Sequence, residues 1–124
     1  MSEEEFRAIA LSMPGAAESS HMGHPDFRTA LAAGSRSKRG KIFATLIDDE
    51  AGEVGVVMLT PQEQAALIAE APGVFEPVSG KWGEGGATRV LLKRAGKRLV
   101  RRAVEMAWRG KGGGAGKSQM ADRK

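Results

Sequence analysis

Apolar residues recur at helical spacing in three segments of the chain, and two of these segments begin with a recognisable cap. The first runs from Ser2 to Met13, where Ser2 and Glu5 have the spacing of a capping box and a Pro-Gly pair follows. The second runs from Thr60 to Ala71 and repeats the capping box, with a proline at the first helical position. The third, Ala95 to Arg109, places an apolar pair on each turn and basic residues elsewhere. The pattern predicts three helices, the last with one apolar and one cationic face.

Shorter apolar and β-branched runs predict five strands. The clearest are Lys41 to Ile47 and Val54 to Leu59, which are separated by an acidic, glycine-containing turn and should form a hairpin. Val74 to Val78 and Ala87 to Leu92 flank a glycine-rich connection, and Asp26 to Leu31 is a weaker strand that follows a proline. Because short turns join consecutive strands, the order favours an antiparallel sheet with helices packed on one face. The fold class is therefore α+β, with about five strands.

The length and composition suit one domain. The chain has 124 residues, of which 41% are apolar, although many of these are alanine. A chain of this size buries roughly two-thirds of the surface that its unfolded form exposes, which is enough for one compact core. We assign the domain to residues 1–109 and expect an exposed, mobile loop from Ala32 to Gly40. Residues 110–124 are rich in glycine and lysine and are expected to form a disordered tail.

Several classes of protein are excluded or disfavoured by composition. No stretch approaches the roughly 20 apolar residues that span a bilayer, so we expect no membrane partner. The start, MSEEEFRAIA, lacks the basic and apolar regions of a secretory signal, and a cytoplasmic location is expected. The absence of cysteine excludes disulfides, thiolate zinc sites and cysteine nucleophiles.

The net charge of +4 is unevenly distributed along the chain. From Arg109 onward there are five basic residues against Asp122, so the preceding part sums to zero. Within that neutral part, however, the span from Arg89 to Arg102 holds seven basic residues and no acidic one. The average conceals a local cationic patch, which is typical of a protein with a polyanionic partner.

Five short motifs carry a family resemblance. They are ALSMPGAAES (Ala10 to Ser19), HMGHPDFR (His21 to Arg28), GKIFATL (Gly40 to Leu46), LTPQEQAAL (Leu59 to Leu67) and KWGEGGATR (Lys81 to Arg89). In this order they resemble the MmcQ/YjbR family of small bacterial proteins, over about residues 6–108. The resemblance implies a CyaY-like α/β sandwich and the family's usual label of DNA binding. Two departures, the segment ALAAGSRSKRG and the Gly/Lys tail, both add positive charge.

Nucleic-acid binding is the first functional hypothesis. Its candidate residues lie in the basic loop, near the glycine-rich connection and along the last helix: Arg36, Lys38, Arg39, Lys41, Trp82, Arg89, Lys93, Lys97, Arg98 and Arg101. Lysine and arginine displace condensed counterions from phosphates, so such a set can bind DNA weakly without reading its sequence. The alternative is that these cations form only a solvated helix face and a soluble tail.

Trp82 has two interpretations. It sits between a lysine and a glycine run, where an aromatic ring could stack on an unpaired base. The interpretation that we favour is that Trp82 fills the edge of the core, while the glycines provide turns with positive φ.

The second functional hypothesis is a non-enzymatic module for a small anionic ligand or a protein partner. It would use a cleft between the HMGHPDFR and KWGEGGATR segments, with Lys41 and Arg89 receiving an anion. The residues assigned to this cleft are His21, His24, Asp26, Arg28, Lys41, Trp82, Thr88 and Arg89. Neither hypothesis requires more than a monomer.

We expect no catalytic residue, metal or cofactor. His21, His24 and Asp26 are only three potential ligands in a proline-containing turn, which more often form hydrogen bonds than a metal site. A serine precedes His21, but no nucleophile elbow or charge partner accompanies it. The tail sequence GGGAGKS lacks the first glycine of a phosphate-binding loop, because Lys111 stands there.

Overall fold

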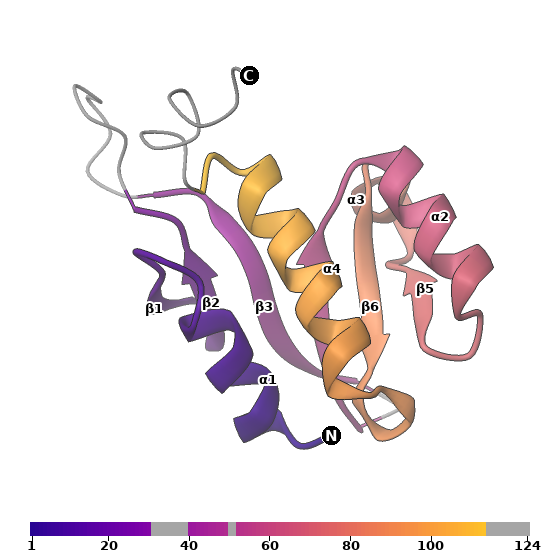
Figure 1. Ribbon diagram of the computed structural model, residues 1–124, viewed down its shortest axis with the longest axis horizontal. Coiled ribbons are helices and arrows are strands. Elements are labelled where there is room, and N and C mark those ends of the chain that lie inside the picture. The colour runs from indigo at the N-terminus through magenta and orange to yellow at the C-terminus, as the bar shows by residue number, and fades with distance from the viewer. Residues whose placement is uncertain (31–39, 50–51, 114–124) are drawn as a thin grey trace.

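The computed structural model describes residues 1–30, 40–49 and 52–113 (Figure 1). The helices are α1 (Glu3–Leu11), α2 (Pro61–Glu70), α3 (Gly80–Glu84) and α4 (Lys97–Gly110), and a 3₁₀ turn, η1 (Leu92–Arg94), precedes α4. The strands are β1 (Ala17–His21), β2 (His24–Arg28), β3 (Ile42–Asp49), β4 (Gly52–Met58), β5 (Phe75–Pro77) and β6 (Ala87–Leu91). Three candidate residues, Arg36, Lys38 and Arg39, lie outside the described residues.

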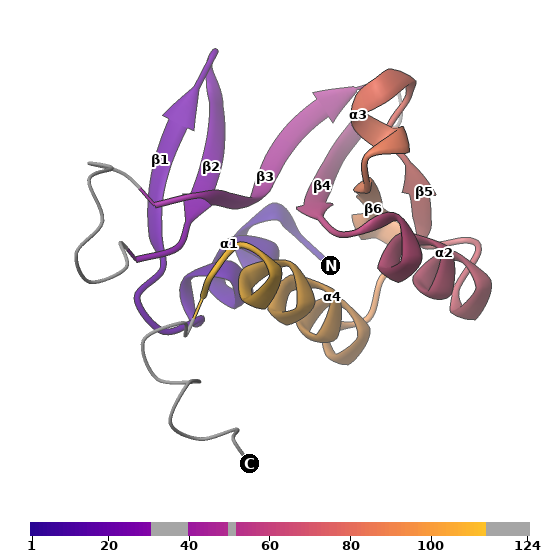
Figure 2. The same cartoon turned by 90° about the horizontal axis from the view of Figure 1, so that it is seen from above.

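The strands form one antiparallel sheet in the order β1-β2-β3-β4-β6-β5. Helices α1 and α4 pack against each other, α4 crosses β3 and β4, and α2 packs beside β5. The β1–β2 hairpin forms one edge of the sheet, and in Figure 2 its turn points away from α1 and α4. Figure 2 shows α1 and α4 under one face of the sheet, and the opposite face is turned away from these two helices. We call these the helix-covered face and the second face. The predicted antiparallel α+β fold is confirmed, with one strand more than the five expected.

The sequence pattern missed two elements, β1 and α3. Strand β1 has the sequence AESSH and is mostly exposed, so it lacks the apolar alternation that marks a half-buried strand. It forms because its backbone pairs with β2 across a two-residue turn, and this pairing also moves the predicted strand from Asp26–Leu31 to His24–Arg28. Helix α3 is five residues long, contains two glycines and has no side-chain cap, so the local sequence does not predict a helix there.

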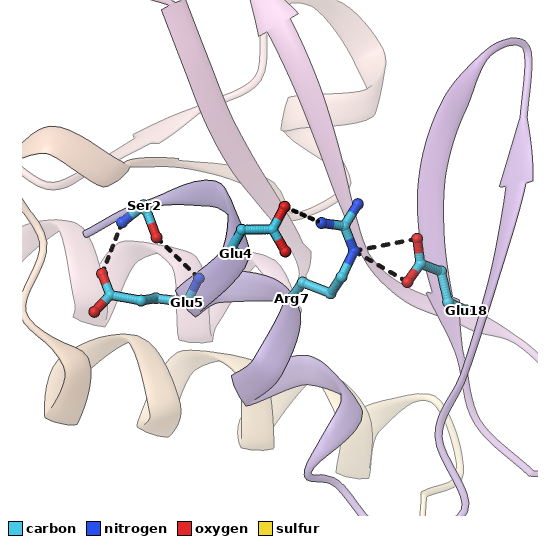
Figure 3. A network of polar contacts seen from close by, with 5 residues as sticks. All are labelled: Ser2, Glu4, Glu5, Arg7 and Glu18. Carbon is cyan, nitrogen blue, oxygen red and sulfur yellow. Dashed lines mark hydrogen bonds and ion pairs between the residues drawn. The ribbon is translucent and has the colours of Figure 1, made fainter.

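The start of α1 shows how local signals place an element in the fold (Figure 3). The Ser2 hydroxyl accepts from the Glu5 N–H at 3.1 Å, and Glu5 accepts from the Ser2 N–H at 2.8 Å, so the predicted capping box is confirmed. Arg7 then donates from Nε to both carboxylate oxygens of Glu18, at 3.1 and 3.3 Å, and from Nη1 to Glu4 at 3.0 Å. The Arg7–Glu18 ion pair links α1 to the edge strand β1.

The hydrophobic core fills the helix-covered face. Phe6 from α1 is fully buried and meets Phe27 edge to face, with ring centroids 6.4 Å apart. Its ring lies over Gly55 in β4, where an added Cβ would stand 2.6 Å from a ring carbon. From α4, Val100 and Val104 are fully buried against the sheet. The apolar positions predicted for the first and last helices therefore do face the core.

Helix α4 extends one residue beyond the predicted domain end at residue 109. The chain then turns back, because the Gly113 N–H donates to the Trp108 carbonyl at 2.7 Å. The Trp108 indole donates to the Pro14 carbonyl at 3.2 Å, which fixes the end of α4 against the loop after α1. Residues 110–113 thus belong to the fold, and the tail prediction for residues 114–124 lies outside the described residues. No helix within the described ranges has the length and apolar character needed to cross a membrane.

Candidate functional site

One row of directly paired residues crosses all six strands on the second face. The pairs are Ser19 with Asp26, Asp26 with Thr45, Thr45 with Val56, Val56 with Arg89, and Arg89 with Glu76. Residues directly opposite one another on antiparallel strands project to the same face and lie close together. Five of the six side chains in this row are polar, although several of them are buried. Such a row is the most unusual feature of the sheet, because buried polar groups need partners.

Asp26 is the centre of a hydrogen-bonded network at one end of this row. Its side chain is fully buried, and Arg28 donates from Nε to Oδ1 at 2.8 Å and from Nη2 to Oδ2 at 2.9 Å. His21 Nδ1 lies 2.8 Å from Oδ2, and it donates when the carboxylate is ionised. The paired arginine is the main cause that holds the pKa of Asp26 below its usual range, and the same contact raises the pKa of Arg28. The network therefore keeps a buried carboxylate charged.

Thr45 follows Asp26 in the row. Its side chain is fully buried, and its Oγ1 has no hydrogen-bond partner within the described part of the chain. Leaving a buried hydroxyl without a partner costs about 1–3 kcal/mol. Nothing in the sequence marks this residue, because a threonine in a strand is ordinary and only the sheet register shows what surrounds it.

Arg89 lies at the other end of the row. It forms an ion pair with Glu76 across β5 and β6, and its side chain is largely buried. Thr88 precedes it and therefore points to the helix-covered face, where it is fully buried, donates to the Gly86 carbonyl and accepts from Gln64. The structure thus separates Thr88 from the cleft assigned to it, since neighbouring strand residues face opposite sides of a sheet.

Trp82 and Lys41 lie outside the strands that form this row. Trp82 in α3 is 47% exposed, so the interpretation that it fills the core edge was wrong. Its ring borders a shallow cavity of about 160 Å³ with Met58, Leu59 and Lys111 among the lining residues. The predicted positive φ is confirmed for two glycines of this segment, Gly80 at the start of α3 and Gly86 after it, with φ of 80° and 117°, whereas Gly85 has φ of −82°. Lys41 is exposed just before β3, where its backbone pairs with Thr29, the residue after Arg28.

The cations of α4 lie on the opposite side of the molecule from the second face. Arg98 and Arg101 are exposed, and Arg101 donates to the Ser12 hydroxyl at 3.2 Å. Two others carry ion pairs: Lys97 with Glu5 at 3.2 Å and Arg102 with Glu70 at 2.7 Å. The predicted cationic helix face therefore exists, but acids from α1 and α2 neutralise part of it.

Lys93 lies apart from both groups. It belongs to η1 and lines a cavity of about 340 Å³ at the end of the sheet, together with Arg94, Glu53 and Glu76. The seven nucleic-acid candidates within the described residues are thus divided among α4, η1, α3, the start of β3 and the second face. Of the ligand-cleft candidates, the structure brings together His21, Asp26 and Arg28, with His24 beside them across the hairpin.

Comparisons with known proteins bear on the family and the fold. A family model described as YjbR matches residues 11–110. Among solved structures, the chain is similar to Deinococcus radiodurans protein DR2400, of domain family DUF419, with 14% identity and a TM-score of 0.62 over 85% of this chain and 74% of that chain. It is also similar to a protein from Pseudomonas syringae, with 16% identity and a TM-score of 0.67 over 90% of this chain and 99% of that chain. At such low identities these likenesses show the fold alone. No curated protein matches the chain.

Proposed function

We propose that this chain, which belongs to the YjbR family, binds nucleic acid weakly through the phosphate backbone, with the outer face of α4 as its main contact surface. The observation that carries the proposal is the exposed arginine row of α4, opposite its buried apolar side. Guanidinium groups are suited to phosphate because they present several donors in a planar fork. Contacts of this kind position a duplex or a single strand without reading its sequence.

The ion pairs on this surface are consistent with such a role. Arg102 and Glu70 are both about half exposed, at 52% and 48%, and exposed pairs contribute little to stability. A phosphate can therefore replace the glutamate at small cost. The acids that remain nearby reduce the local positive potential, which supports weak rather than tight binding. Each phosphate that is neutralised releases condensed counterions, so the affinity should fall steeply with salt.

The test is fluorescence anisotropy of labelled duplex and single-stranded DNA at several salt concentrations. A double variant, Arg98→Ala with Arg101→Ala, removes two cations from α4. The matched control, Lys117→Ala with Arg123→Ala, removes two cations from the tail. We expect the α4 variant to lower the salt-dependence slope by about 2 and to weaken binding at low salt by roughly 10-fold or more. Unchanged binding by the α4 variant, or equal binding loss from the tail control, would refute an α4 site.

A second candidate function is favoured by Thr45. A small anionic ligand on the second face could accept from the Thr45 hydroxyl while Arg28 and Arg89 flank it, and it would satisfy a buried polar group. The test is a titration with succinate and with inorganic phosphate, followed by the His21 and Thr45 resonances. Saturable shifts that Thr45→Val abolishes are expected. Shifts that grow linearly, or that persist in the variant, would exclude this site.

A further inference from the structure

We propose that the turn of the β1–β2 hairpin, His21-Met22-Gly23-His24, binds one monovalent copper ion. The ligands would be an imidazole nitrogen from each histidine and the thioether sulfur of Met22. Both histidines of the chain lie in this turn. Figure 2 places the turn at the end of the hairpin that points away from α1 and α4, so the site is accessible. This inference is independent of the proposed nucleic-acid binding.

His21 has the arrangement of a supported metal ligand. Its Nδ1 is bonded to the Asp26 carboxylate at 2.8 Å, and Arg28 holds that carboxylate from the other side. A histidine whose Nδ1–H donates a hydrogen bond to a carboxylate presents the lone pair of Nε2 for a metal, and metal-bound histidines usually have such a partner. The His21 side chain is 36% exposed, so Nε2 can be reached from solvent. Asp26 therefore supports His21 and is not itself a ligand.

The spacing of the two rings suits one shared metal. His21 and His24 are a directly paired residue couple, and their ring centroids lie 6.3 Å apart. Two imidazoles bound to one metal at about 2.0 Å have centroids roughly 5–6 Å apart, depending on the angle at the metal. The observed separation is slightly above this range, so the His24 ring must move closer to His21 for both to bind one ion.

Met22 is the unusual residue of the turn. Its φ is 50° and that of Gly23 is 82°, which is the left-handed pair of a type I′ turn, where asparagine is favoured at the first position. The left-handed conformation is disfavoured for a residue with a side chain such as methionine. The Met22 side chain is 92% exposed, so no packing compensates this cost. Strain without a packing benefit is typical of functional positions.

The donor set determines the metal. Among the described residues, no group of three or more histidine, cysteine, aspartate or glutamate side chains is arranged for a metal, which disfavours zinc at this turn. Two imidazoles and one thioether form a soft set of three ligands, and thioethers favour monovalent copper. In the sequence alone, Asp26 is the third potential ligand beside His21 and His24, and no metal is expected there. The contact between Asp26 and His21 changes that count, because it leaves Met22 as the third donor.

The experiment is an anaerobic competition titration of the full chain with Cu⁺ against a chromophoric Cu⁺ chelator. Met22→Leu and His24→Gln remove one ligand each at exposed positions, and Met106→Leu on α4 is the matched control. We expect one Cu⁺ per chain, an affinity at least 10-fold lower in Met22→Leu and in His24→Gln, and no change in Met106→Leu. Titration with Ag⁺, which is stable in air, should shift the Met22 methyl and both imidazole resonances, but not the Met106 methyl.

Three results would overturn the proposal. One is no uptake of Cu⁺ against the chelator. Another is equal affinity of Met22→Leu and the parent chain, because the thioether would then not be a ligand. The third is tighter binding of Zn²⁺ than of Cu⁺ in parallel titrations, because that order contradicts a soft donor set.

Discussion

The two faces of the sheet bury different kinds of side chain. The helix-covered face is filled by apolar side chains such as Phe6, Phe27 and Val104, and its charges stand outside on α4. The second face buries Asp26 and Thr45 beside the small apolar residues Val54 and Val56. Apolar burial stabilises in proportion to area, whereas buried polar groups stabilise only when their partners are complete. The stability of the second face is therefore sensitive to the loss of single polar atoms, and that of the helix-covered face to changes in side-chain volume.

Two arginine–carboxylate pairs show the same contrast. Arg28 donates two hydrogen bonds to Asp26, and Arg102 donates two to Glu70, at 2.7 and 3.2 Å. In both pairs the arginine lowers the pKa of the carboxyl. Only the first carboxylate is buried. Solvent screens the second pair, so the two pairs contribute differently to the free energy of unfolding although their geometry is similar.

The largest expected effect is a cavity in the helix-covered face. Phe6→Ala should lower the free energy of unfolding by about 3–5 kcal/mol, because it removes a fully buried ring whose place over Gly55 no other residue fills. Urea denaturation would show a lower midpoint with an unchanged slope. Leu11→Ala, on the same helix but 40% exposed, is the control and should lose much less. Equal losses would mean that volume does not dominate this face.

Removal of the buried charge on the second face comes next. Asp26→Asn should lower the free energy of unfolding at neutral pH by about 3 kcal/mol, because Arg28 then remains largely buried without its counter-charge. The measurement is urea denaturation of parent and variant at neutral pH. A loss below that of an ordinary surface substitution would contradict the buried-pair interpretation.

The same pair gives a pH dependence with a definite sign. The folded-state pKa of Asp26 is lowered, so its stabilisation is fully present above the ordinary carboxyl value of 3.8 and is lost as the pH falls through the lower folded value. The parent should therefore lose stability more steeply than Asp26→Asn below about pH 4. Parallel acid titrations of the two proteins would contradict the assignment.

Two buried threonines should give smaller changes in stability, of opposite sign, when each is replaced by valine. Thr45→Val replaces a hydroxyl that has no partner within the described residues and should raise the free energy of unfolding by about 1 kcal/mol. Thr88→Val removes a hydroxyl that is bonded to Gly86 and Gln64 and should lower it by about 1–2 kcal/mol. Thermal or urea unfolding of both variants tests whether their stabilities change in opposite directions. Destabilisation by both substitutions would mean that Thr45 is satisfied on the second face.

The smallest effect is expected at the exposed pair. Glu70→Gln and Arg102→Ala should leave the urea midpoint nearly unchanged, because solvent and salt screen both groups. A double-mutant cycle between the two positions measures their coupling directly. A coupling as large as that between Asp26 and Arg28 would remove the distinction between the two faces.

Local sequence signals predicted most elements of this fold. Both capping boxes are present where residues three apart suggested them, since such contacts form within one helical turn. The hairpin of β3 and β4 and the apolar side of α4 also agree with the pattern. The family resemblance, carried by short motifs, is confirmed by the match over residues 11–110.

The candidate sites divide in the same way. His21, Asp26 and Arg28 are close in sequence, so the motif that contains them could be singled out before their contacts were known. Their alignment with Thr45 and Arg89 could not, because it depends on the register of strands that are far apart in the chain. The same register places Thr88 on the opposite face of the sheet. Strand β1 could not be predicted from its exposed sequence, because only backbone pairing with β2 forms it.

The capped helices, the apolar side of α4, the α+β class and the family can be predicted from the amino-acid sequence, because each rests on local periodicity or on contiguous motifs. The folded structure is needed to show which polar residues share the second face, which arginine is buried with its carboxylate, and that Met22 is exposed. These outcomes depend on strand pairing and burial, and both are set by contacts between residues distant along the chain.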